Sequence, residues 1–255
     1  MTESEQNELV LQYAVRLGDD ALILGHRLSE WCRNGPFLEE DIALSNIALD
    51  YIGRARMYYS YAADLSASGK TEDDFAFLRD CREYQNLLIN ELPRGDFAQT
   101  MARQLVLDVF YSLQLAGLCT SKDSNLAAIA AKAAKETRYH LRRSTDWALR
   151  LGDGTEESHA RLQSGFDAIW GYIPEMFEQD ELEQQLVELG IAVDTAKLKP
   201  EWDRQISSIL SEATIAIPEQ DWTVRGGRAG FHTEHLGHLL SELQYMQRTY
   251  PGLDW

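Results

Sequence analysis

The sequence contains few residues that break helices. Only six prolines occur among 255 residues, and long stretches contain neither proline nor paired glycines. Proline ends or kinks a helix because it lacks a backbone N–H and its ring clashes with the preceding turn. The scarcity of such breaks favours long, uninterrupted helices.

Cysteines and long apolar runs are also scarce. Cys32, Cys81 and Cys119 are far apart, and no Cys-x-x-Cys pair occurs. This pattern predicts reduced, mostly buried thiols in a cytoplasmic protein. No stretch reaches the roughly 18 apolar residues of a membrane-spanning helix. The first residues, MTESEQNELV, are acidic and polar, whereas a signal peptide begins with positive charge followed by an apolar run. We therefore expect a cytoplasmic location and no membrane partner.

Basic residues are in deficit. The chain has 24 Lys and Arg against 41 Asp and Glu, a net charge of −17. Because such a surface repels polyanions, we expect no nucleic-acid partner. The acidity suits a basic partner surface or a cationic ligand without choosing between them. With 44% hydrophobic residues the chain can bury a sizeable core, as one large domain or one domain with a helical extension.

The apolar spacing predicts an all-α fold. We expect long helices at residues 5–33, 37–66, 96–119 and 125–151, with Asp96 as an N-cap. Residues 67–96 form a long connection with short helical pieces at 74–79 and 84–90. Further helices are expected at 156–179, 181–189, 199–216 and 233–250. Two short turns and one long crossover are typical of a ferritin-like four-helix bundle. We therefore predict a single ferritin-like domain over residues 1–255, with a core bundle at about 5–151 and a C-terminal helical extension at about 155–250.

Acidic residues lie where such a bundle would hold a di-iron site. That site takes one carboxylate from each of two helices and a Glu-x-x-His pair from each of the other two. Asp20 and Asp50 lie about 15 residues on either side of the first turn, and Asp108 and Glu136 lie about 14 on either side of the second. At 1.5 Å per residue, each pair is expected roughly 21–23 Å from its turn. All four carboxylates are thus expected at one level of the bundle.

The imidazoles of that site are missing. Asp50 is followed three residues later by Gly53, and Glu136 by Tyr139, with His140 one position further on. A di-iron enzyme built on these positions would lack two ligands. We therefore predict that this chain has no catalytic residues and no metal, and that the former di-iron positions are vestigial: Asp20, Asp50, Asp108, Glu136 and His140.

Buried carboxylates need partners, because leaving one unpaired costs several kcal/mol. Arg54 is four residues after Asp50, and Arg16 is one turn before Asp20. We expect these arginines to balance the acids. The alternative is an enzyme with an unusual carboxylate-rich metal site on the same five positions.

A series of short runs shows a family resemblance across nearly the whole chain. The runs are Leu17-Gly18-Asp19-Asp20, Arg27-Leu28-x-Glu30-Trp31-Cys32, Ile47-Ala48-Leu49-Asp50, Asn86-Leu87-Leu88, Asp96-Phe97-Ala98-x-Thr100, Ala102-Arg103-Gln104, Lys135-Glu136-x-Arg138-Tyr139-His140-Leu141, Gly190-Ile191-Ala192-Val193-Asp194, His232-Thr233-Glu234-His235-Leu236-Gly237 and Gln244-Tyr245-x-Gln247-Arg248. In their order and spacing, they resemble the C-subunit family of the bacterial phenylacetyl-CoA 1,2-epoxidase, a multicomponent monooxygenase.

The resemblance implies a partner and a role. In that family the catalytic A subunit has the same fold, carries the iron, and epoxidises the aromatic ring of phenylacetyl-CoA with O2 and electrons from a reductase subunit. The C subunit resembles a degenerate copy that pairs with its catalytic relative and supports it. The resemblance thus implies no cofactor in this chain, iron in its catalytic partner, and further small and reductase subunits in the complex.

Three other features could have either a structural role or a role in binding or catalysis. His232, His235 and His238 could be a metal cluster, but steps of three residues drift by about 60° around a helix, and Thr233 is a plausible N-cap. The structural role is favoured here. The loop from Arg225 to Gly230 could cradle a phosphate of coenzyme A, although pairing of its arginines with acids is favoured. The tyrosines could form an electron path or an interface, and packing is favoured for them: Tyr51, Tyr58, Tyr59 and Tyr61.

Three functions follow for testing. The leading one is a structural subunit in an enzyme complex. The second is an enzyme with its own carboxylate-rich metal site, and the third is a stand-alone ferritin-like binding protein. Metal analysis separates the first two, and co-purification with a second helical subunit separates the first from the third.

Overall fold

The computed structural model describes residues 2–219 and 221–253. Within these residues the ordered elements are helices, and no strand occurs. The all-α prediction is therefore confirmed. No helix in the described ranges has the length and apolar character needed to cross a membrane.

The chain divides into two compact units. The first contains the residues up to Pro93 and those from Gly226 onward, and the second runs from Arg94 to Arg225. This division differs from the predicted one, because residue 151 lies inside the second unit rather than at a boundary. That the whole chain is one domain stays a prediction, and each unit is described by itself.

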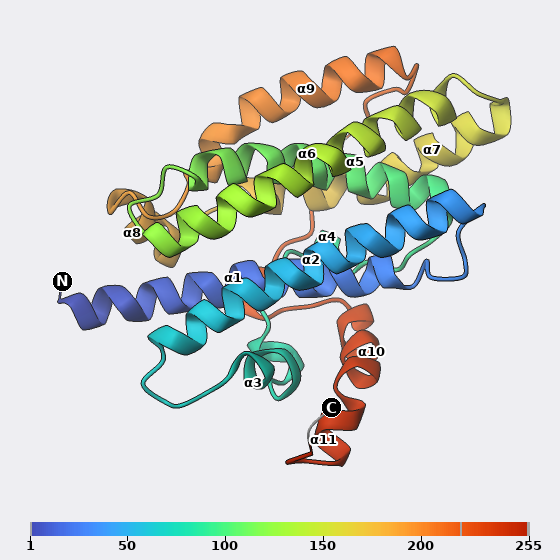
Figure 1. Cartoon of the computed structure of the whole chain (residues 1–255). Helices are drawn as coiled ribbons and strands as arrows, with labels where there is room; N and C mark the ends of the chain where they lie inside the picture. Colours follow the sequence, from blue (N-terminus) through green and yellow to red (C-terminus); the bar gives the residue numbers. More distant parts are fainter. Residues whose placement is uncertain (1, 220, 254–255) are drawn as a thin grey trace. The chain divides into compact units, whose positions relative to one another are not determined.

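The first unit is built on a helical hairpin of α1 (Glu3–Ser29) and α2 (Leu38–Leu65), which lie side by side (Figure 1). Thr2 caps α1 by accepting a hydrogen bond from the Glu5 amide. The helices approach closely at Gly25, where an added Cβ would lie 3.2 Å from the Ala48 carbonyl oxygen. The buried sides of the two helices are mostly apolar, but charged residues such as Asp19, Asp20 and Arg54 are buried among them.

Short helices from both ends of the chain complete the first unit. They are α3 (Glu72–Phe77), η1 (Cys81–Glu83), α4 (Leu88–Glu91), η4 (Gly227–Ala229), α10 (Glu234–Leu243) and α11 (Tyr245–Thr249). Arg27 of α1 ties two of them together by donating to the Glu91 carbonyl at 3.0 Å and to the His235 carbonyl at 3.2 Å. A segment more than 130 residues away in sequence from the hairpin thus packs with it in one unit.

Two predictions in this unit are wrong in detail. Residues 84–87 are extended rather than helical, because the Gln85 and Leu87 amides donate to the carboxylates of Asp19 and Asp20 instead of to a helical carbonyl. The helix expected over 233–250 is interrupted at Gln244. The side-chain amide of Gln244 donates to the Arg79 carbonyl at 2.9 Å and to the Tyr84 hydroxyl at 3.2 Å.

The second unit contains the other two long helices and the former extension. Its elements are α5 (Phe97–Leu118), α6 (Ser124–Gly152), α7 (Glu156–Ile169), η2 (Trp170–Phe177), α8 (Glu181–Glu188), η3 (Thr195–Leu198) and α9 (Lys199–Glu212). Asp96 is the N-cap of α5, as predicted, and accepts from the Gln99 amide. Trp202 is buried beside Phe177 and Trp170, and its indole donates to the Val106 carbonyl at 3.1 Å.

Two helices in the second unit are shorter than predicted. The helix expected over 156–179 becomes a 3-10 helix at Trp170, and Pro174 lies within this segment and has no amide to donate. The helix expected over 199–216 ends at Glu212. Beyond it Thr214 adopts a positive φ of 59°, and the Ile215 amide donates back to the Leu210 carbonyl.

Candidate functional site

The five candidate positions are divided between the two units. Asp20 and Asp50 lie on the α1–α2 hairpin of the first unit, and Asp108, Glu136 and His140 lie on α5 and α6 of the second. Asp20, Asp108 and His140 are buried, whereas Asp50 and Glu136 are half-buried. How the acids of the first unit lie relative to those of the second stays a prediction.

Asp20 has a complete set of partners from its own chain. One carboxylate oxygen, Oδ1, accepts from the Leu87 amide at 2.7 Å and from the Asn90 side chain at 3.1 Å. The other, Oδ2, accepts from Nη2 of Arg228 at 2.8 Å. Burial raises the pKa of Asp20, while the charge and hydrogen bond of Arg228 act in the opposite direction. The Asp20 carboxylate thus joins α1 to other segments of the first unit and does not face an open site.

The loop before α10 supplies that arginine. Besides Asp20, Arg228 donates to the Gln85 carbonyl at 2.6 Å. Within the second unit, Arg225 pairs with Glu178 at 2.8 Å. At Gly230, with a φ of 74°, an added Cβ would lie 2.3 Å from the Arg82 carbonyl oxygen, so only glycine fits. The interpretation that the loop's arginines pair with acids of the protein is confirmed.

A second buried acid, Asp19, was not singled out from the sequence. It forms an ion pair with Arg79 and accepts from the Tyr59 hydroxyl at 2.6 Å and from the Gln85 amide at 2.8 Å. Burial and the Asp19 charge raise the pKa of Tyr59. Burial alone would lower the pKa of Arg79, but the Asp19 carboxylate raises it above its usual value. Asp19 therefore holds the connection over residues 67–96 against α1. The only signal for this role in the sequence is that Asp19 lies next to Asp20.

His232 belongs to a pair rather than to a histidine cluster. One ring nitrogen, Nε2, lies 2.8 Å from the Tyr84 carbonyl, and Nδ1 lies 3.5 Å from Oε1 of Glu91, which is fully buried. Burial lowers the pKa of His232, but its hydrogen bond and charge interaction with Glu91 outweigh burial, so the pKa is raised. By contrast, His238 is exposed, and Thr233 caps α10 as predicted.

The hairpin does not place Asp20 and Asp50 side by side. Gly25 packs against the backbone of Ala48 and the Cβ of Tyr51, so Asp50 lies about level with Gly25. Asp20 is five residues earlier, roughly 7–8 Å along the helix. The expected alignment is therefore wrong by more than one turn, because Gly25 rather than Asp20 lies level with Asp50. The turn itself spans residues 30–37, so the register follows from the close packing at Gly25 and not from the position of the turn. Three residues after Asp50, an added Cβ at Gly53 would meet no atom within 4 Å, so that position borders open space.

In the second unit, Asp108 has a hydrogen-bond partner on α6, and whether it also lies beside Glu136 stays a prediction. Asp108 accepts from the Ser144 hydroxyl at 2.8 Å, about two turns further along α6 than Glu136. Tyr139, which stands where the second imidazole would be, is 44% exposed. His140, the next residue, is buried, and its ring lies 6.3 Å from that of Tyr139.

These residues do not fit a di-iron group. In the described ranges, no group of three or more His, Cys, Asp or Glu side chains lies close enough to hold a metal ion. The Asp20 carboxylate is taken by Arg228, Leu87 and Asn90, and no imidazole stands at residues 53 or 139.

The tyrosines of α2 pack inside the protein. Tyr51, Tyr58 and Tyr59 are buried, and Tyr61 is half-buried. Tyr59 lies against Phe75 with ring centroids 6.0 Å apart. The packing interpretation is thereby confirmed for three of the four.

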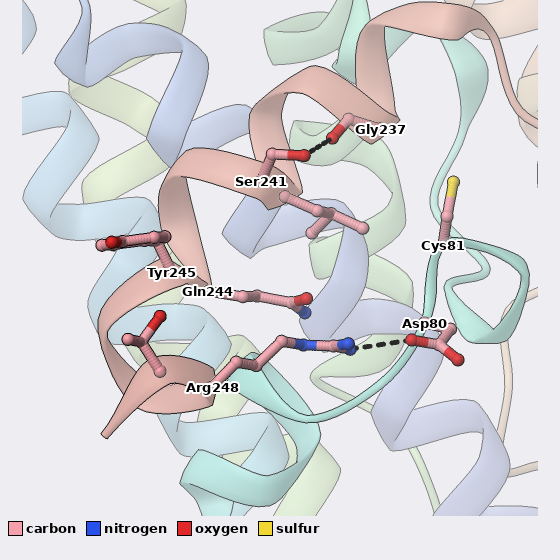
Figure 2. Close-up of a pocket in the computed structure, with 9 residues that line it drawn as sticks. Asp80, Cys81, Gly237, Ser241, Gln244, Tyr245 and Arg248 are labelled. Carbon is pink, nitrogen blue, oxygen red and sulfur yellow. Dashed lines mark hydrogen bonds and ion pairs between the residues drawn. The ribbon is translucent and has the colours of Figure 1, made fainter. Parts of the chain in front are cut away.

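A cleft of about 360 Å³ lies between η1 and the C-terminal helices of the first unit (Figure 2). Its wall includes the ion pair of Arg248 with Asp80 at 2.9 Å and the hydrogen bond from Ser241 to the Gly237 carbonyl. Burial and the nearby Glu91 raise the pKa of Cys81, which keeps this thiol protonated near neutral pH. The cleft therefore offers contact surface but no activated nucleophile. The prediction that the thiols are mostly buried is wrong, because Cys81 is half-buried and Cys32 and Cys119 are exposed.

Comparison with known proteins identifies the family. A family model described as "Phenylacetic acid catabolic protein" matches residues 1–255. The chain belongs to the phenylacetic acid catabolic protein family. A curated member, the C subunit of the 1,2-phenylacetyl-CoA epoxidase of Escherichia coli (strain K12), is 46% identical over 243 residues, which cover 95% of this chain and 98% of that protein. The resemblance found in the sequence is confirmed, and the all-α, ferritin-like fold class of the phenylacetic acid catabolic proteins agrees with the helices described above.

Proposed function

We propose that this chain is a non-catalytic structural subunit of a phenylacetyl-CoA 1,2-epoxidase, and that it pairs with a catalytic di-iron subunit of the same fold. The observation that carries the proposal is the environment of Asp20. Its two oxygens accept from Leu87, Asn90 and Arg228, so the α1 carboxylate stabilises the first unit instead of binding metal. Because Asp20 serves the stability of its own unit in place of metal binding, the chain would contribute to the enzyme by binding another subunit.

Two further observations support this role. Gly53 and Tyr139 lack the imidazoles that a di-iron site takes three residues after its carboxylates. The similarity to the C subunit of the E. coli epoxidase extends over nearly all of both chains, which supports membership in a complex of the same kind. The wider complex would include small and reductase subunits, with the iron in the catalytic subunit. No contact described above favours a metal enzyme or a stand-alone binding protein.

The test is turnover of phenylacetyl-CoA by the reconstituted complex carrying Asp50→Asn or Glu136→Gln in this chain. Activity is expected to fall only as far as assembly or melting temperature falls, because these carboxylates have no catalytic task. Loss of turnover with normal assembly and melting would show that they are functional.

Iron analysis provides an independent check. The purified chain is expected to contain no stoichiometric iron and to show no di-iron absorbance, whereas both are expected in the catalytic subunit. About two tightly bound irons per copy of this chain would contradict the structural role and favour the carboxylate-rich enzyme. Copurification with the catalytic subunit is expected in the same preparation, with an interface on the order of 2,000 Å².

A further inference from the structure

Helix α6 carries a row of basic residues on a strongly acidic protein. Lys132, Lys135, Arg138 and Arg142 are all exposed, in a chain whose net charge is −17. Their spacing of three, three and four residues places them on one side of the helix. Together with Tyr139, they are called the basic face of α6.

These four cations have no acidic partner among residues 2–219 and 221–253, unlike several other cations of the same unit. Arg161 pairs with Glu157, Lys199 with Asp203, and Arg204 with Glu201. No ion pair within the described ranges involves any of the four cations of the basic face, and Glu136, the acid nearest in sequence, is half-buried. A protein with an excess of acidic residues has many possible partners for a lysine or arginine, so four neighbouring cations without an ion pair are unexpected.

The row is also unfavourable for the helix itself. Like charges three and four residues apart on a helix repel each other. A glutamate at any of these positions, the more common kind of charge in this chain, would relieve the repulsion. Helix stability therefore does not explain the row, and a ligand outside the chain would.

An aromatic residue lies within the row. Tyr139 is 44% exposed, and the guanidinium of Arg142 lies 5.8 Å from its ring centroid. Tyrosine and arginine are the residue types enriched where protein interfaces are most sensitive to substitution. The neighbouring exposed residues, Ala128 and Ala131, are small and would let another surface approach closely.

We propose that the basic face of α6 is the docking surface for an acidic helical face of the catalytic subunit. The row from Lys132 to Arg142 is about 15 Å long, which suits a helix with carboxylates at matching spacing. Arginine binds carboxylates through two parallel hydrogen bonds, so Arg138 and Arg142 would add orientation as well as attraction. A nucleic acid is disfavoured because the rest of the chain repels it. The identity of the partner rests on the proposed function, while the surface itself does not.

The test measures, at low and at near-physiological salt, the dissociation constant between this chain and the catalytic subunit. The variant carries Lys135→Glu, Arg138→Glu and Arg142→Glu, and the control carries Lys70→Glu, an exposed cation of the first unit. The triple variant is expected to raise the dissociation constant on the order of tenfold or more and to weaken its salt dependence, because charge attraction becomes repulsion. The control is expected to change it by less than about threefold. Equal affinity of the triple variant and the wild type would overturn the proposal.

A photo-crosslinking residue at position 139 gives a second readout that does not depend on affinity. In the assembled complex it is expected to crosslink to the catalytic subunit through a peptide rich in Asp and Glu, while the same residue at Tyr245, on α11, is not. Crosslinks from position 139 to a second copy of this chain, to nucleic acid or to nothing would overturn the proposal. If the wild-type chain failed to bind the catalytic subunit, the proposed function would fail first; binding that persists without crosslinks at 139 would leave the proposed function intact and reject only this surface.

Discussion

The ion pair of Asp20 with Arg228 is buried: the side chains are 3% and 16% exposed, and the atoms are 2.8 Å apart. Removing one partner of such a pair leaves a charge in a place that water cannot reach. We predict that Arg228→Met lowers the free energy of unfolding by about 3–5 kcal/mol, as measured by urea denaturation.

The partner substitution provides the control. Asp20→Asn is expected to cost less, because a neutral amide keeps an acceptor for the Leu87 amide and because the Arg228 cation that it leaves unpaired is the more exposed of the two groups. In the double variant, the cost is expected to be smaller than the sum of the two single costs. Additive costs would mean that Arg228 stabilises the unit through packing alone.

The His232–Glu91 pair predicts a pH dependence. Because the pKa of His232 is raised in the folded protein, its contribution to stability is fully present below about pH 6.5 and is lost as the pH rises through the raised value. The difference in unfolding free energy between wild type and His232→Gln should therefore shrink from pH 6 to pH 8.5. A difference that stays constant over this range would show that the imidazole is not charged in the folded state.

Single residues also show where sequence reasoning reaches its limit. A buried, balanced Asp20 was predicted, but the expected partner was Arg16, one helical turn away. The actual partner is Arg228, which lies 208 positions further along the chain. Local sequence patterns cannot predict a contact between residues so far apart. Arg16 lies 3.4 Å from Gln85, and the guanidinium of Arg54 lies 4.7 Å from the Tyr51 ring centroid. That Arg54 balances Asp50 stays a prediction.

Among the helices, the α1–α2 contact predicts opposite effects for two glycines. An added Cβ at Gly18 would lie 2.5 Å from the Tyr59 ring, whose hydroxyl bonds Asp19. Gly18→Ala is expected to cost about 1–3 kcal/mol, since the ring must move and the bond is disturbed.

Gly53→Ala on α2 is the matched control, because an added Cβ there meets nothing within 4 Å. Alanine is the better helix former, so this change is expected to stabilise the protein by about 0.5–1 kcal/mol. Melting temperatures of the two variants decide the matter. Destabilisation by Gly53→Ala would mean that another surface fills this space.

The long helices could be predicted from the sequence to within a few residues, because apolar periodicity and caps such as Asp96 act locally. The helices that were predicted wrongly end where another interaction replaces the helical hydrogen bonds of the backbone. Residues 84–87 give up helical hydrogen bonds for the carboxylates of α1, and the segment after Trp170 tightens around Pro174. That Gly53 and Tyr139 are not histidines is plain from the sequence, whereas the register of the hairpin depends on the close packing at Gly25, which no local pattern indicates.

For the whole molecule, the last part of the chain is predicted to hold the first unit together. A chain ending at Arg225 would lose three contacts. They are those of Arg228 with Asp20, of His232 with the Tyr84 carbonyl, and of Gln244 with the Arg79 carbonyl. By hydrogen exchange, the Gln85 and Leu87 amides are expected to lose protection, while those of α6 and α9 in the second unit keep theirs. Equal loss in both units would show that they unfold together.

The separation of 208 positions between Asp20 and Arg228 also matters while the protein is being made. On the ribosome, the second unit emerges as one contiguous segment and can fold as soon as it leaves the exit tunnel. The first unit cannot be completed until the residues from Gly226 onward have been synthesised. During that interval the nascent α1 carries two acids whose basic partners are made later, with Arg228 last, and loop closure over such a span is slow. A pause or a stop in synthesis before Arg228 would therefore leave an incomplete first unit joined to a folded second unit.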